Sequence, residues 1–218
     1  MDNYYGKYVR GFAVNSEQAA KLMNADNIIG DIYKVKCEMV DGKHRAVVLN
    51  RFGETPVYFD SETSREIAIN QAKGFMSYAI LTLVGFTTKH SEDEEDSSES
   101  YWAEFAVISF PNYEKEAFTR FVETISKSVK KNRRPEVALS EEDVQKVISS
   151  NGDFLPTATH PKSEKVKGQV LMKSRVSLTD MMVEEGRKKN PGCYIFGWLF
   201  LLAFVALVIL LIKTILGL

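Results

Sequence analysis

The sequence contains little of the chemistry on which most enzymes depend. Only two of its 218 residues are cysteine and three are histidine, and they form no CxxC pair and no Cys/His cluster. This usage excludes a disulfide framework and a zinc site of the usual spacing. The motifs GxSxG, GxxxxGK[ST], HExxH and GxGxxG are missing as well. We therefore expect no bound metal, no cofactor and no catalytic activity.

The chain also lacks an excess of either charge. It has 28 basic and 29 acidic residues, a formal net charge of −1, so as a whole it is neither a basic nucleic-acid binder nor an acidic solvated tail. The first ten residues, MDNYYGKYVR, do not contain the apolar stretch of a signal peptide. We therefore expect the N-terminal part to stay in the cytoplasm.

One long stretch lacks charge altogether. Residues 193–212 read CYIFGWLFLLAFVALVILLI, and a helix of that length extends about 30 Å, the thickness of the hydrocarbon core of a bilayer. We predict a transmembrane helix over residues 193–213, with the lipid bilayer as its partner. Tyr194 and Trp198 are expected at one interface, and Lys213 at the other.

The residues that flank this stretch predict its orientation. Arg187, Lys188 and Lys189 precede it, whereas only Lys213 lies near its end. By the positive-inside rule, residues 1–190 face the cytoplasm, and the chain is a single-pass, tail-anchored protein. Cys193 is either a juxtamembrane palmitoylation site or simply an apolar residue that enters the bilayer.

The cytoplasmic part has the patterns of an α+β domain. Strand-like and helical segments alternate over residues 1–135, which predicts a small, mainly antiparallel β-sheet or barrel with flanking helices. Residues 91–100, SEDEEDSSES, are expected to form a solvated acidic loop between two adjacent strands. A metal site and a phosphorylation cluster are the alternatives for this run.

Two further segments follow the domain. Residues 136–150 are predicted to be a helical extension, because Ser140 and Asp143 match a capping box before an apolar pattern. Prolines and small polar residues then predict a linker and juxtamembrane segment over residues 151–190.

Residues 4–88 carry a succession of short motifs. Val9-Arg10-Gly11 is followed by a helix over 16–25, a strand at 35–38, a strand at 46–49, a glycine turn at Gly53, a strand at 57–59 and a helix from Ser64. This succession resembles the HIRAN domain, a small β-barrel module that is found beside helicase and nuclease domains and is associated with DNA ends. The resemblance implies a barrel and a DNA ligand. Between Glu38 and Ala46 the sequence departs from the acidic, asparagine-containing stretch of that family.

Basic residues gather around the first predicted turns. Lys43, His44, Arg45 and Arg51 lie close together in the sequence. They form either a phosphate-facing patch, with nucleic acid as the ligand, or ordinary solvated turns. The nucleic-acid interpretation predicts that Lys43, Arg45 and Arg51 share one face with an aromatic residue such as Tyr58.

These observations predict a membrane-anchored binding or adaptor protein without catalytic activity. Its cytoplasmic domain is expected to engage a protein partner through an exposed apolar patch or a free sheet edge. One alternative is a HIRAN-like nucleic-acid-binding module held at a membrane. Another is a longin-like trafficking protein without a full SNARE motif, because Lys173 and Ser177 interrupt the heptads before the span.

Overall fold

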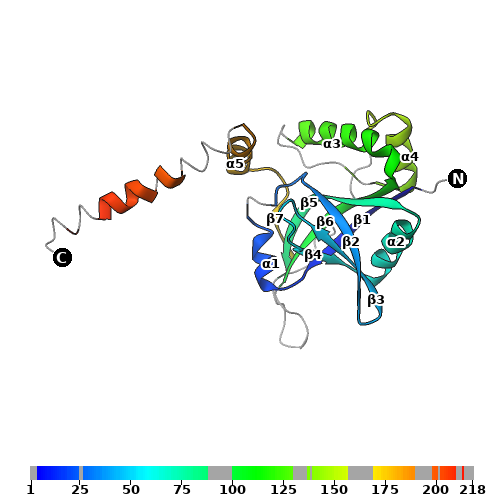
Figure 1. The fold of residues 1–218 in the computed structure, drawn as a ribbon, viewed down its shortest axis with the longest axis horizontal. Coiled ribbons are helices and arrows are strands. Elements are labelled where there is room, and N and C mark those ends of the chain that lie inside the picture. Colours follow the sequence, from blue (N-terminus) through cyan, green and yellow to red (C-terminus); the bar gives the residue numbers. More distant parts are fainter. Residues whose placement is uncertain are drawn as a thin grey trace. The chain divides into compact units, whose positions relative to one another are not determined.

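Six antiparallel strands close into a barrel in the computed structural model of this protein (Figure 1). The strand order is β2-β3-β4-β1-β6-β5, and a pairing between β2 and β5 closes the sheet. A seventh strand, β7, continues the sheet beyond β5. The structure describes residues 4–24, 27–87, 100–129, 137, 139–156, 169–189, 198–200, 202–209 and 213.

The chain divides into two compact units, residues 1–176 and 177–218. The second unit contains α5 (Leu178–Lys189) and further helical residues at 198–200 and 202–209. The elements of the first unit are β1 (Tyr5–Ala13), α1 (Ser16–Lys21), β2 (Ile32–Val40), β3 (Lys43–Leu49), β4 (Val57–Phe59), α2 (Ser61–Ala72), β5 (Phe75–Thr87), β6 (Ser100–Pro111), the 3-10 helix η1 (Asn112–Glu114), α3 (Lys115–Val129), α4 (Glu141–Ser149) and β7 (Gln169–Lys173).

The core of the barrel is built by the inward-facing residues of alternating positions on each strand. Phe105 of β6 is fully buried, and its ring meets Tyr33 of β2 and Phe59 of β4 edge to face, with ring centroids 5.6 and 5.7 Å apart. Such pairs add to the free energy gained from burial alone. The barrel is therefore a packed core and not an open channel.

Side chains of helix α2 form hydrogen bonds with the backbone of β2, β3 and β4. The Ser64 hydroxyl accepts a hydrogen bond from the Ala46 amide at 2.9 Å and donates one to the Phe59 carbonyl at 3.2 Å. The Gln71 side chain bonds the backbone of β2, accepting from Cys37 N at 3.3 Å and donating to Val35 O at 2.9 Å. The amide thus satisfies strand groups of β2 beyond the point where its pairing with β5 ends.

Helices α3 and α4 cover another part of the barrel wall (Figure 1). Phe118 of α3 stacks on Tyr78 of β5 with ring centroids 4.8 Å apart. The N-terminal end of α4 lies close to β1, since a Cβ built on Gly6 would lie 2.4 Å from the carbonyl oxygen of Ser140, the N-cap of α4. Glycine at this position is what allows the close approach.

The N-cap of α2 gives a testable prediction. Burial alone would raise the pKa of Asp60, but hydrogen bonds from the Thr63 amide (2.8 Å) and hydroxyl (2.9 Å) outweigh this effect and lower the pKa. A lowered pKa means that the ionised cap stabilises the fold above the unfolded-state pKa, and that this contribution is lost as the pH falls through the folded-state pKa. Asp60→Ala is expected to reduce the free energy of unfolding by about 1 kcal/mol at pH 7.

Urea unfolding of both proteins at pH 7 and at about pH 3 checks this prediction, because the difference should shrink below the usual aspartate pKa of about 4. Asp153→Ala, at an exposed position outside any cap, is the control and should change stability little. An equal loss at both pH values would contradict the capping role.

The structure confirms the expected α+β class, the antiparallel barrel and the flanking helices. Residues 91–99 of the predicted acidic loop lie outside the described residues, whereas Ser100 is the first residue of β6; β5 and β6, which the run joins, are adjacent, with Thr87 opposite Ser100. The structure differs from expectation at residues 169–173 and 178–189, which form β7 and α5 within the segment interpreted as a linker. The HIRAN resemblance stays a prediction, although a closed barrel is what it implies.

No helix in the described part of the chain is long and apolar enough to span a bilayer. Of the predicted transmembrane segment, residues 198–200, 202–209 and 213 are described, and all are helical and exposed. The other residues of 193–213 lie outside the described ones, so the span stays a prediction.

Candidate functional site

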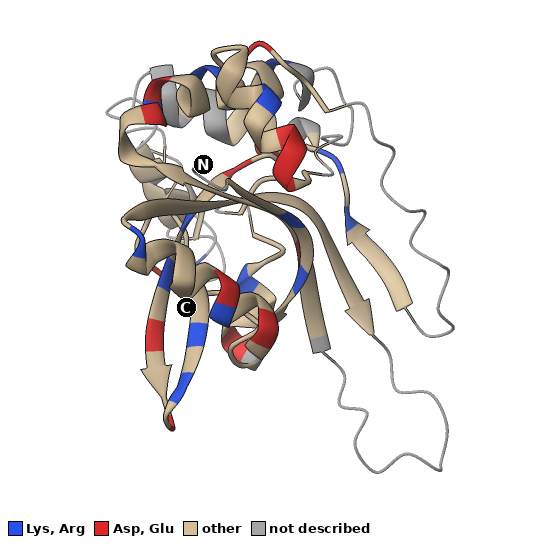
Figure 2. Cartoon of the chain, turned by 90° about the vertical axis from the view of Figure 1, so that its right-hand side faces the viewer, with Lys and Arg blue, Asp and Glu red and all other residues tan. Residues whose placement is uncertain are grey.

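The hairpin of β2 and β3 carries several basic residues on one side of the barrel. Strands β2 and β3 are joined by the turn Asp41-Gly42, in which both residues have positive φ angles, 51° and 73°. Turns of this kind match the twist of a hairpin and favour Asp-Gly. Figure 2 shows lysine and arginine positions along both strands of this hairpin.

Alternation along the strands places four of these cations on the outer side of the barrel. Lys36 lies opposite Val47, and Arg45 opposite Glu38. We call this surface the basic face; it consists of the cations Lys34, Lys36, Lys43 and Arg45, the acidic residue Glu38, and the aromatic residues Phe12 and Tyr58.

The aromatic residues reach the basic face through the pairing of β1 with β4. Phe12 lies opposite Tyr58, with ring centroids 6.1 Å apart, and Phe12 is 42% exposed. The Arg45 guanidinium lies 5.2 Å from the centroid of the Tyr58 ring. A guanidinium at this distance is attracted to the face of the ring, so the cation is held over the sheet without losing its charge.

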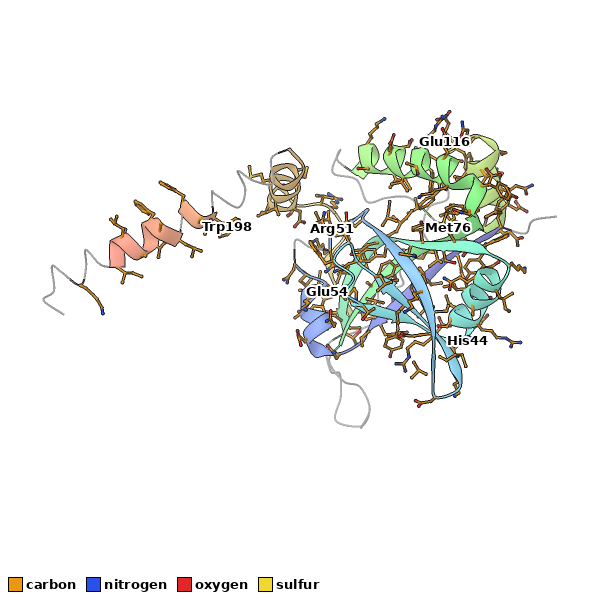
Figure 3. The ribbon with its side chains drawn as sticks, in the orientation of Figure 1. His44, Arg51, Glu54, Met76, Glu116 and Trp198 are labelled. Atoms are coloured by element: carbon orange, nitrogen blue, oxygen red, sulfur yellow. The ribbon has the colours of Figure 1, made fainter. Side chains whose placement is uncertain are left out.

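The structure separates the four predicted nucleic-acid contacts into two groups. Lys43 and Arg45 share the basic face with Tyr58, whereas the nucleic-acid interpretation predicts that Arg51 lies there as well. His44 projects from the opposite side of β3, and Arg51 lies in the loop beyond the far end of β3 with its guanidinium 5.4 Å from the Phe52 ring centroid. Figure 3 shows His44 and Arg51 at opposite ends of the barrel. Arg51 is therefore not part of the basic face.

A polar cluster adjoins the basic face on β1, β5 and β6. Glu104 is 7% exposed, and its carboxylate accepts hydrogen bonds from the Tyr8 hydroxyl at 2.7 Å and from the Arg10 guanidinium at 3.2 Å. The Thr82 hydroxyl lies 2.8 Å from that of Tyr8. The Arg10 guanidinium also stacks on Trp102, 3.8 Å from a ring centroid. We call Tyr8, Arg10, Thr82 and Glu104 the Glu104 cluster.

The hydrogen bonds of the Glu104 cluster join β1, β5 and β6, and we therefore interpret the cluster as a structural support. Its neighbour Trp102 packs directly on Gly85, where a Cβ would lie 2.2 Å from the indole. The cluster therefore fixes Arg10 and Trp102 at the border of the basic face.

Strand β7 presents an open, apolar sheet edge. It pairs with β5 on one side, and no strand of the described residues pairs with its other side. Its side chains Val170, Leu171 and Met172 are all exposed. The strand is held in place by Lys173, which is buried and donates hydrogen bonds to the carbonyls of Asn24 (3.3 Å) and Asn27 (3.0 Å). An edge of this kind is a template for pairing with another chain.

Two features bear on metal binding and on thiol chemistry in the described part of the chain. Within the described ranges, no three His, Cys, Asp or Glu side chains are grouped to hold a metal ion. Burial raises the pKa of the Cys37 thiol to about 11, so it is protonated at neutral pH and a poor nucleophile. Its Sγ lies 3.7 Å from the Ser64 carbonyl oxygen, to which it donates.

The predicted membrane-interface residues are described only in part. Arg187, Lys188 and Lys189 form the last residues of α5, and Trp198 and Lys213 lie in helical conformation. Tyr194 and Cys193 lie outside the described residues, so the palmitoylation prediction for Cys193 is open.

Sequence reasoning missed Lys34, Lys36 and Phe12 as members of the basic face. The alternation of β2 indicates that its lysines share one side, but only the pairing of β2 with β3 places them beside Arg45. Comparison with known proteins adds no assignment, because no protein-family model, no curated protein and no solved structure matches the chain.

Proposed function

We propose that this protein is a binding or adaptor protein without catalytic activity, anchored in a membrane by residues 193–213 with its barrel in the cytoplasm. The observation that carries the proposal is the open edge of β7, with three consecutive exposed apolar side chains. A partner segment in extended conformation would add to this edge as a further strand. Main-chain hydrogen bonds would then provide affinity, and the apolar side chains would select the partner residues.

Several features of β7 support the proposal that its open edge binds a partner. Natural proteins commonly protect edge strands with outward charges or proline, whereas the central residues of β7 are Val-Leu-Met and its lysine is turned inward. A bulge between Val84 and Gly85 of β5 shifts the register near Met172, so the regular part of the edge is short. A short edge suits a reversible interaction.

The experiment is affinity capture with the full chain, cross-linked in its own membranes and identified by mass spectrometry. Leu171→Lys places a charge on the open edge and is expected to remove at least about 90% of the specific partner. Ile69→Lys, at an exposed apolar position on α2, is the matched control and should retain the partner. Equal capture by both variants would exclude β7 as the docking edge.

The anchor and its orientation are tested separately. After carbonate extraction the chain should remain with the membranes, and a tag at the N-terminus should be digested by protease added to the cytoplasmic side. A tag that is protected in sealed vesicles of known orientation would reverse the topology, and release of the chain by carbonate would exclude the anchor.

A further inference from the structure

Three of the four cations of the basic face have no carboxylate partner among the described residues, and the fourth, Arg45, lies opposite Glu38. Lys34, Lys36 and Lys43 make no ion pair with any residue that the structure describes. Other cations of the barrel are neutralised: Lys7 by Glu66 at 2.9 Å and Lys21 by Glu54 at 2.9 Å. The basic face therefore keeps a local positive charge on a chain whose net charge is −1, which complements an anionic surface.

An exposed apolar side chain lies among these cations. Phe12, on the basic face itself, is 42% exposed, whereas Met39 lies opposite His44 and projects from the other side of the hairpin. A surface that combines lysine and arginine with exposed apolar side chains suits the boundary between lipid headgroups and acyl chains. A purely electrostatic contact does not require an exposed phenylalanine on the same face.

The length of chain between the barrel and the predicted span brings a membrane within reach. Residues 177–192 separate the first unit from the span, and 12 of them form α5. A helix of that length extends about 18 Å, and the remaining residues add at most about 14 Å. A bilayer held by the anchor is then present at high effective concentration for any surface of the barrel that can reach it.

We propose that the basic face docks onto the anionic phospholipid headgroups of the membrane in which the chain is anchored. This inference rests on the anchor of the proposed function. The phosphates of a nucleic acid offer similar chemistry, but the tether favours the lipid surface, which is always nearby. Docking of the basic face holds the barrel against the membrane and limits the directions in which β7 can meet its partner.

The test uses the full chain in vesicles, with a fluorescent probe on the basic face. Cys37 and Cys193 are replaced by serine, and Val40→Cys, opposite Lys43 in the hairpin, carries an environment-sensitive dye. We expect the dye signal that reports contact with lipid to rise at least about threefold when phosphatidylcholine vesicles contain 30% phosphatidylserine, and to fall again at high salt.

Charge reversal tests whether the basic face is the surface that contacts the lipid. In the double variant K36E/K43E, the rise of the dye signal with phosphatidylserine should be at least about threefold smaller than in the parent protein. The matched control K115E/K127E changes the net charge equally at exposed positions of α3 and should respond as the parent protein does. An equal response of the two variants would show that only net charge matters and would overturn the proposal.

Two further outcomes separate this inference from the proposed function. If the chain does not float with the vesicles in high salt, the anchor is wrong, and the proposed function fails with it. If the chain floats but the dye ignores phosphatidylserine, only the docking of the basic face is wrong. Binding of a single-stranded oligonucleotide that depends on Lys36 and Lys43, without any lipid response, would instead assign the basic face to nucleic acid.

Discussion

Replacing Phe105 with alanine is expected to lower the free energy of unfolding of the barrel by about 3–5 kcal/mol. The ring is fully buried and meets Tyr33 and Phe59 edge to face. The three rings come from β6, β2 and β4, so the loss of the central ring opens a cavity between strands that are distant in the sequence. The stiff barrel wall cannot collapse to fill it, which places the cost in the upper part of the range for core substitutions.

Urea denaturation of the full chain in detergent, followed by circular dichroism, measures this loss. Phe12→Ala removes the same atoms at a position that is 42% exposed and should cost less than about 1 kcal/mol. If the two substitutions prove equally costly, Phe105 is not the centre of the core.

Local sequence patterns predicted those parts of the fold that local physics determines. The capping box of α4 is present, with the Ser140 hydroxyl accepting from the Asp143 amide at 3.2 Å, because its two hydrogen bonds join residues three apart. The Asp41-Gly42 turn is local in the same way, since its φ angles need no distant contact. The caps of α1 and α2 are Asn15 and Asp60, although the nearby residues Ser16, Ser61 and Thr63 are also of types that cap helices.

These neighbouring residues can all cap a helix, so the residue type alone does not identify the first helical position. The backbone entering the helix makes that choice: Asp60 has ψ near 168°, outside the helical region. The identity of an N-cap therefore depends on the backbone conformation with which the chain enters the helix.

The parts that the sequence did not predict depend on contacts between distant segments. β7 has only five residues, and its pairing with β5 joins segments about eighty residues apart, as in Gly85 opposite Leu171. The basic face shows the same limit. Lys43 and Arg45 are placed together by alternation, but Phe12 arrives through the pairing of β1 with β4, and Arg51 is carried away by the extended course of β3.

Glu104→Met is expected to destabilise the barrel by about 2–4 kcal/mol, because it removes the acceptor of two hydrogen bonds in the Glu104 cluster. Tyr8 can still bond Thr82 at 2.8 Å, whereas the Arg10 guanidinium loses its only carboxylate partner among the described residues. Glu104→Gln keeps the shape and one acceptor oxygen, so it should cost less than Glu104→Met.

The decisive comparison is the double variant R10M/E104M, studied by the same urea denaturation. Removing both charged partners leaves no uncompensated charge beside Trp102, and methionine can fill much of the space of either side chain. The double variant should therefore be at least about 1 kcal/mol more stable than additivity of the two single variants predicts. Strict additivity would mean that Arg10 and Glu104 do not stabilise each other. In that case Arg10 would be held at the border of the basic face by its stacking on Trp102, 3.8 Å from a ring centroid, and by its hydrogen bond to the Gln169 side chain at 3.5 Å.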